Sequence, residues 1–302
     1  MGTFVGHIVP GLAFTFLGLW HIINTIRAFK LRGLISFTSR PWYPFTTSSF
    51  TIKHLELLTI LSFSILAMAM QLLDHPLFHP SFKLIDLEHA TMFLHLAIYA
   101  SVALAVDLVQ WPPDTFSGLV GVLACSVFGQ ELLLLHFHSA DHVGLEGHYH
   151  WLLQLVVCVS LLSAVATTVC PSSFPAALVR SASILLQGCW FINMGFVLWV
   201  PSLVPKGCSV RFLEDDDMHG AVTCGTHEAT QRAMALANLQ FSWMLAGIMI
   251  LAAFLCLTPD RRCADRSVST EYEKLRDGRI RDVGLMVIDD ADGLKQTSLT
   301  VL

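Results

Sequence analysis

The sequence predicts an all-α integral membrane protein, a bundle of seven transmembrane helices. Of its 302 residues, 54% are hydrophobic and only 14% are charged, whereas a soluble domain carries roughly a quarter charged residues. The apolar residues fall in seven runs of about 20 residues, the length that crosses a bilayer core of roughly 30 Å as a helix. Strands of a transmembrane barrel would be shorter and would alternate in polarity, so the run lengths indicate helices.

The runs place the spans, in chain order, at 4–28, 54–73, 87–109, 115–137, 150–169, 176–200 and 233–257. We therefore expect one seven-span domain over residues 1–257. The remaining tail, 258–302, is polar and has no helical hydrophobic periodicity, so we expect it to be cytosolic and largely disordered.

The distribution of basic residues predicts the orientation. They are concentrated after the first span and in the tail, and six spans separate these two segments, so both lie on one side. Short loops rich in Lys and Arg face the cytosol, which places the N-terminus in the lumen or outside the cell. The basic residues concerned are Arg27, Lys30, Arg32, Arg40 and Lys53 after the first span and Arg261, Arg262, Arg266, Lys274, Arg276, Arg279 and Arg281 in the tail.

With this orientation the loop 201–231 is lumenal and carries Cys208 and Cys224. An oxidising compartment would allow a disulfide between them, although the sequence does not fix their separation in space. The loop after the first span interleaves aromatic residues such as Trp42 and Tyr43 with Ser and Thr, and we expect it to lie at the lipid headgroups.

Polar residues inside the spans have simple structural interpretations at two places. At the start of the second span, His54 and Glu56 lie on the cytosolic side, where we expect snorkelling or an interhelical contact. In the sixth span, Gln187 precedes Gly188, which favours an interhelical amide hydrogen bond beside a close helix contact.

The lumenal ends of four spans carry most of the histidines and acids that lie at the ends of spans. Glu131 lies about two turns inside the fourth span and shares a helix face with His138, seven residues later. A bare carboxylate at that depth is costly, so it should be protonated, paired or bound to a cation. Imidazole and carboxylate groups suit Zn²⁺, or Cu²⁺ or Fe²⁺, although no known zinc signature is present. The predicted metal ligands are His7, His89, Glu131, His138, His142 and His150.

Three other interpretations of these residues remain open. They could form a hydrogen-bonded network between helices without a metal, or a proton or ion relay. Axial haem ligation needs two histidines that face each other. His54 and His136 could be proposed for that role, but the topology places them at opposite ends of the bundle.

Several segments together resemble the plant branch of the transmembrane protein 45 family over roughly residues 1–260. The resemblance implies a multi-pass protein of the endomembrane system or plasma membrane. It implies no reaction and no catalytic residues, because the domain has no known function, and some plant relatives carry a label for virus or stress response. The matching segments are Gly6-His7, Pro10-Gly11, Gly18-Leu19-Trp20, Glu88-His89-Ala90-Thr91-Met92, Glu131 with the His-rich turn after it, His150-Trp151-Leu152-Leu153, Leu185-Leu186-Gln187-Gly188-Cys189-Trp190-Phe191 and Gly195-Phe196-Val197-Leu198.

The sequence leaves three functions open. The first is a membrane adaptor, associated with stress or defence, that acts through its loops and tail. The second is a membrane-embedded metal-dependent lipid hydrolase, in which a metal lowers the pKa of a bound water. The third is a metal-ion or proton transporter. We expect the protein to contact the lipid bilayer and to bind protein partners, and we expect it to bind no nucleic acid.

Overall fold

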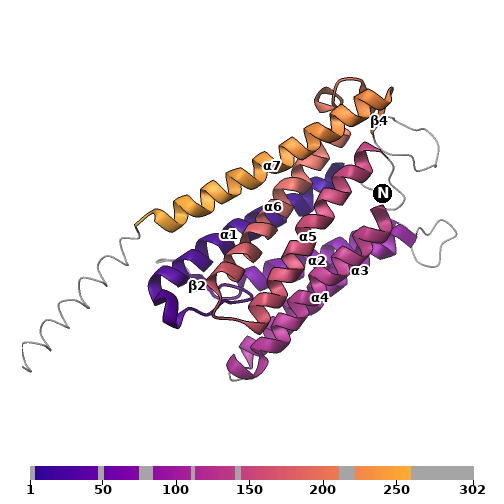
Figure 1. Ribbon diagram of the computed structural model, residues 1–302. Coiled ribbons are helices and arrows are strands. Elements are labelled where there is room, and N and C mark those ends of the chain that lie inside the picture. Colours follow the sequence, from indigo (N-terminus) through magenta and orange to yellow (C-terminus); the bar gives the residue numbers. More distant parts are fainter. Residues whose placement is uncertain are drawn as a thin grey trace, which may run out of the picture. The chain divides into compact units, whose positions relative to one another are not determined.

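The computed structural model describes residues 4–46, 51–74, 84–109, 113–139, 144–210 and 222–259. Figure 1 shows a bundle of long helices, and all seven are long and apolar enough to cross a membrane. The predicted all-α transmembrane fold is therefore confirmed. The helices are α1 (Phe4–Ser36), α2 (Leu55–Asp74), α3 (Leu84–Leu108), α4 (Pro113–Ser139), α5 (Leu145–Val169), α6 (Phe174–Trp199) and α7 (His227–Leu257).

The chain divides into two units, Met1–Cys256 and Leu257–Leu302. The first unit contains the bundle. The predicted tail lies almost entirely outside the described residues.

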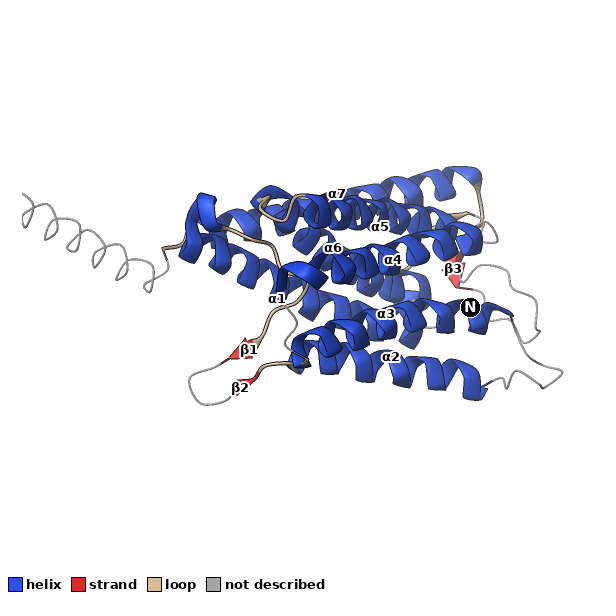
Figure 2. Cartoon of the chain, turned by 90° about the horizontal axis from the view of Figure 1, so that it is seen from below, coloured by secondary structure: helices blue, strands red, loops and turns tan. Residues whose placement is uncertain are grey.

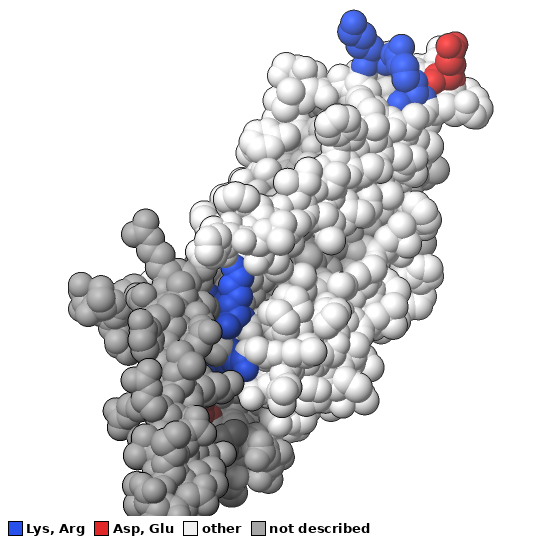
Figure 3. All heavy atoms as spheres, turned by 60° about the vertical axis from the view of Figure 1, so that its left-hand side comes forward, with Lys and Arg blue, Asp and Glu red and all other residues white. Residues whose placement is uncertain are grey.

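Large apolar side chains cover the outer surface of the bundle. Phe16, Leu66 and Trp243 are 70%, 63% and 73% exposed. In a soluble monomer, contiguous apolar surface on this scale is rare, whereas a bilayer covers it. Figure 3 agrees, because the charged side chains on the face in view gather at two places with an uncharged surface between them.

Helix α6 is the central helix, with 67% of its membrane window buried, against 11% for α7. It packs along α1 through glycines spaced seven residues apart on each helix. A Cβ atom on Gly11 would lie 2.8 Å from Ile192 Cγ1, and one on Gly18 would lie 2.5 Å from Leu185 Cα. On the facing helix, a Cβ on Gly188 would lie 2.6 Å from Thr15 Oγ1. Small residues thus let the two backbones approach closely, as is typical of helix contacts in membranes.

Helix α7 is joined to the bundle by polar contacts. Tyr149 Oη donates to Gln240 Oε1 at 2.7 Å, and Asn193 Nδ2 donates to the same oxygen at 3.2 Å. His148 Nε2 lies 2.8 Å from Asn238 Oδ1. Such contacts hold a helix that buries little of its own surface.

Two short hairpins mark the two ends of the bundle, as Figure 2 shows. The pair β1 (Phe45–Thr46) and β2 (Thr51–Ile52) lies at one end, here called the loop-one end. The pair β3 (Cys208–Val210) and β4 (Val222–Cys224) lies at the other, beside the start of α1, here called the amino-terminal end. This separation agrees with the alternating threading that the sequence predicts.

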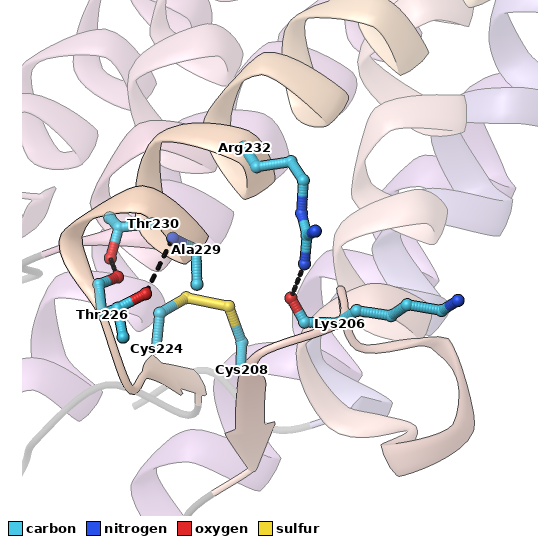
Figure 4. The surroundings of a disulfide bond; sticks show 7 residues. All are labelled: Lys206, Cys208, Cys224, Thr226, Ala229, Thr230 and Arg232. Carbon is cyan, nitrogen blue, oxygen red and sulfur yellow. Dashed lines mark hydrogen bonds between the residues drawn. A yellow bond between two sulfur atoms is a disulfide. The ribbon is translucent and has the colours of Figure 1, made fainter.

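A disulfide joins Cys208 to Cys224, the two residues that pair at the edge of the β3–β4 hairpin. Figure 4 shows it beneath the start of α7, where Ala229 N donates to Thr226 Oγ1 at 3.1 Å. A guanidinium N–H of Arg232 donates to the carbonyl oxygen of Lys206. These contacts fix the hairpin to α7.

The loop after α1 departs from the prediction. Phe37 and Tyr43 are 1% and 5% exposed, so this loop packs into the bundle and does not simply lie at the headgroups. Helix α1 continues well beyond residue 28 to Ser36, with a break at Gly33, whose φ is 72°. The end of an apolar run marks where the chain leaves the bilayer, and a helix can continue past that point.

Candidate functional site

At the amino-terminal end, two of the predicted metal ligands come together. His7 and His150 are 5% and 4% exposed, and their ring centroids lie 6.0 Å apart in an edge-to-face arrangement. The His7 ring also lies 4.5 Å from that of Trp199, and His150 Nδ1 lies 2.9 Å from the carbonyl oxygen of Glu146. Helices α1 and α5 therefore bring these imidazoles into one buried, partly aromatic environment.

Glu131 lies elsewhere, deeper in the bundle. Its Oε1 accepts a hydrogen bond from Gln187 Nε2, which confirms the predicted interhelical amide bond. Gln187 is level with Phe16 of α1, since Gly18 lies beside Leu185 and the helices are antiparallel. At 1.5 Å per residue, that level is roughly 13 Å from His7 along the axis. The structure does not bring Glu131 to the His7–His150 pair.

The other predicted ligands are placed only in part. His89 is half-buried near the start of α3, the side chain of His138 is not described, and His142 lies outside the described residues. Among the side chains that the structure places, no three from His, Cys, Asp and Glu form a group that could hold a metal ion.

Glu131 Oε2 and Gln187 Oε1 are buried, and neither oxygen has a hydrogen-bond partner among the described residues. Both groups are within the membrane-spanning helices α4 and α6. Next along the same face of α6, Ser160 Oγ donates to Ser183 Oγ at 2.9 Å. A polar region therefore continues through the middle of the bundle between α4, α5 and α6.

A second polar site lies at the loop-one end around Glu56, which is 8% exposed. Trp20 Nε1 donates to its Oε2 at 2.9 Å, and the backbone N–H of Tyr43 donates to the same oxygen at 2.9 Å. His21 Nε2 lies 2.8 Å from Oε1. Buried carboxylates are tolerated when their oxygens are paired in this way. These four residues are called the Glu56 cluster, and they join α1, α2 and the loop.

The loop between α1 and β1 is fixed at further points. Its residues bond to α1, α3, α6 and the turn before α6. These bonds are Ser39 N to Pro171 O at 2.7 Å, Arg180 Nη2 to Arg40 O at 2.6 Å, Tyr99 Oη to Pro41 O at 2.8 Å, and Tyr43 Oη with Thr25 Oγ1 at 2.9 Å.

Burial raises the pKa of the Tyr43 phenol above its ordinary value, and the hydrogen bond with Thr25 offsets only part of this effect. The phenol is therefore neutral near pH 7. A neutral hydroxyl can donate one bond and accept another, which suits its place between α1 and the loop.

At the edge of this end, Asp107 pairs with a lysine and a histidine. Lys53 Nζ lies 2.5 Å and His54 Nε2 lies 2.6 Å from Asp107 Oδ2. His54 is therefore engaged with α3, at the opposite end from His136. The geometry offers no support for a haem shared by these two histidines.

The Glu56 cluster was not predicted as a site. The sequence interpretation placed Glu56 in a simple contact, because residues two apart on one helix do not share a face. A usable signal was the pair Trp20 and His21, both donors, near the same end of the neighbouring span. The third donor, a backbone amide of the loop, leaves no trace in the sequence pattern.

Chemically, the two sites differ. The Glu56 carboxylate of α2 has its hydrogen bonds supplied from two other segments, α1 and the loop, so it acts as a junction that holds these three segments together. Within the cluster, His21 Nδ1 is buried and finds no partner among the residues described. The His7–His150 pair offers two imidazoles that could contribute to a metal site only with further ligands.

Comparison with known proteins gives a family of unknown function and several transmembrane proteins. A family of unknown function, DUF716, matches residues 117–257, which extend from α4 through α7. Transmembrane epididymal protein 1A of Mus musculus is 27% identical over 216 residues, covering 67% of this chain and 68% of its own length. Transmembrane epididymal protein 1 of Rattus norvegicus is 27% identical over 236 residues, with the same coverage. The protein of that name from Homo sapiens is 32% identical over 114 residues, or 38% of this chain and 41% of its own. The chain is thus similar to multi-pass transmembrane proteins, in agreement with its fold.

Proposed function

We propose that this protein is a membrane adaptor that presents the loop between α1 and β1 as a fixed surface for a protein partner. The observation that carries the proposal is the attachment of this loop. Its backbone bonds to Glu56, Arg180, Tyr99 and Pro171, which belong to four different segments. A connecting loop is ordinarily among the more mobile parts of a protein, so this degree of fixation is unusual.

A surface held in one conformation binds a partner with less loss of conformational entropy. The basic side chains of Arg40 in this loop and of Lys53 after β2 are exposed, although Lys53 also pairs with Asp107. An acidic surface on the partner would complement them.

We further infer that the loop-one end faces the cytosol. The short-loop Lys and Arg residues favour this orientation, and the Cys208–Cys224 disulfide at the opposite end suits an oxidising lumen or exterior. The N-terminus would then be lumenal or extracellular and the tail cytosolic, in the endomembrane system or plasma membrane.

The motifs quoted above and the similarity to transmembrane epididymal proteins support assignment to the transmembrane protein 45 family. The resemblance to its plant branch makes a stress or defence response the cellular setting that we propose.

Proximity labelling with a biotin ligase fused to the C-terminus tests the adaptor function. Arg40→Ala removes an exposed charge but keeps the backbone carbonyl that binds Arg180. Lys206→Ala is the matched control, because Lys206 is also exposed and its carbonyl also accepts from an arginine, Arg232. We expect specific neighbours of the wild type to be lost with Arg40→Ala and kept with Lys206→Ala. An identical set of neighbours for all three proteins would contradict the proposal.

A metal site at the amino-terminal end is a second candidate, favoured by the 6.0 Å separation of the His7 and His150 rings. Zn²⁺ is the metal that such ligands suit best, and its presence would favour lipid hydrolysis or ion transport over an adaptor role. Metal analysis of protein purified without chelator tests it. We expect bound metal to be lost from His7→Ala and His150→Ala and kept in the control His227→Ala, which changes an exposed histidine. No metal in the wild type, even after zinc is offered, would exclude the site.

A further inference from the structure

The end of α1 forms a hook that leaves the bundle and returns to it. The hook consists of residues 30–36, and Figure 1 shows it at the left-hand end of α1. Both of its ends are attached to the same aromatic cluster. Phe29 stacks on Phe174 with ring centroids 3.9 Å apart, and Phe37 lies 5.8 Å from Phe29 and 5.6 Å from Phe174.

The tip of this hook is apolar and uncovered. Leu34 is 73% and Ile35 is 99% exposed, and Leu31 is 43% exposed. Gly33, with φ of 72°, turns the chain just before them, a conformation that costs a residue with a Cβ atom but not glycine. The turn thus presents two large aliphatic side chains away from the bundle.

The length of α1 locates the hook at the membrane surface. The part of α1 before the break at Gly33, residues 4–32, spans roughly 43 Å at 1.5 Å per residue, against a hydrocarbon core of about 30 Å. Phe29 is already level with Phe174, the first residue of α6. The hook therefore extends past the end of the neighbouring spanning helix, where headgroups meet the acyl chains.

Basic side chains flank the apolar tip. Arg27 and Arg32 are exposed, whereas Lys30 Nζ donates to the carbonyl oxygen of Leu255 at 2.6 Å and so ties the base of the hook to α7. Residues 27–36 contain no acidic residue. The combination of exposed aliphatic and cationic groups is typical of segments that lie in the interface of a membrane with anionic lipids.

We propose that the hook is an anionic-phospholipid site. Leu34 and Ile35 insert at the boundary between headgroups and acyl chains, and Arg27 and Arg32 bind the phosphate and carboxylate oxygens of the headgroup. A guanidinium presents several N–H donors in a planar fork and matches such oxygens well. This site goes beyond the adaptor role and does not depend on which side of the membrane the hook faces.

The full-length protein in nanodiscs tests the proposal, with phosphatidylcholine alone or mixed with phosphatidylserine. Hydrogen exchange of residues 31–36 should be several-fold slower when phosphatidylserine is present. Native mass spectrometry should show phosphatidylserine retained by the wild type and by the controls Lys206→Ala and Arg40→Ala. Retention should be lost in Arg27→Ala/Arg32→Ala, with an unchanged thermal midpoint because both side chains are exposed.

Equal exchange in the two lipid mixtures, or equal phosphatidylserine retention by the double variant, would overturn the proposal. Protection of residues 31–36 that appears only with a co-purified protein would assign the hook to a protein partner and would also overturn it. Because Arg40→Ala tests the adaptor surface separately, the failure of one proposal can be distinguished from failure of the other.

Discussion

The close contact between α1 and α6 makes a sharp prediction for Gly18→Ala. The new Cβ atom would lie 2.5 Å from Leu185 Cα and closer still to the Leu185 amide nitrogen. Carbon atoms in ordinary contact are about 3.5–4 Å apart, so the two helices must separate by roughly 1 Å. Both neighbouring atoms belong to the backbone, and no side-chain rotation can relieve the clash. We expect the free energy of unfolding to fall by about 1–3 kcal/mol, the usual effect of overpacking.

Gly247→Ala is the matched control, because a Cβ on Gly247 meets nothing within 4 Å. There the change should be neutral or stabilise α7 by up to about 1 kcal/mol, since alanine is the better helix former. Thermal unfolding in detergent, followed by the loss of monodisperse protein in size-exclusion chromatography, measures both variants. At roughly 2–4 °C per kcal/mol, Gly18→Ala should melt several degrees below Gly247→Ala. Equal midpoints would refute the argument that this glycine sets the distance between the helices.

Three further predictions concern the polar groups and the disulfide. Glu56→Leu removes the carboxylate that bonds Trp20, His21 and the Tyr43 amide, and should cost about 3–5 kcal/mol, seen as a collapse of the monodisperse yield. A yield equal to wild type would contradict the proposed junction. Cys208→Ser opens the loop that the disulfide closes, with a sequence separation of 16 residues, and should lower the free energy of unfolding by about 3 kcal/mol. The control Cys170→Ser, at an exposed free cysteine, should leave the thermal midpoint unchanged. The pKa of Tyr43 is raised in the folded state, so the unfolded chain releases the phenol proton first and the free energy of unfolding falls as the pH rises above about 10. Tyr43→Phe should therefore reduce the fall in the thermal midpoint between neutral and alkaline pH. An unchanged fall would count against the burial of this phenol.

The number of helices and their alternating threading through the bundle could be predicted because both follow from the number and length of the apolar runs. The helix ends could not. Helix α5 begins at Leu145 and α7 at His227, several residues before the apolar runs that marked them. At the start of α7 the polar residues His227 and Glu228 are exposed, whereas at the start of α5 Glu146 is buried in the bundle. Both starts are helical without being apolar, so hydropathy carries no signal for them.

The candidate sites show a similar division. Threading correctly predicted that His7 and His150 share one end of the bundle, because topology decides which helix ends meet. The sequence indicated that Glu131 lies about two turns inside its span and that Gln187 makes an interhelical bond, but it could not pair these two residues, since the pairing depends on the register between helices. The Glu56 cluster depends on a loop that folds back, and no periodicity describes such a loop.

The partnership of α1 with α6 has a consequence for how the protein is made. The glycines of α1 face a helix that follows about 170 residues later, which takes roughly 10–30 s to synthesise at 5–20 residues per second. Throughout that interval Thr25, which is 0% exposed in the finished bundle and lies 3.2 Å from Ser181 Oγ of α6, has no α6 to cover it. The first helix must therefore wait beside the insertion machinery until the sixth arrives, so that this polar surface is not left facing lipid.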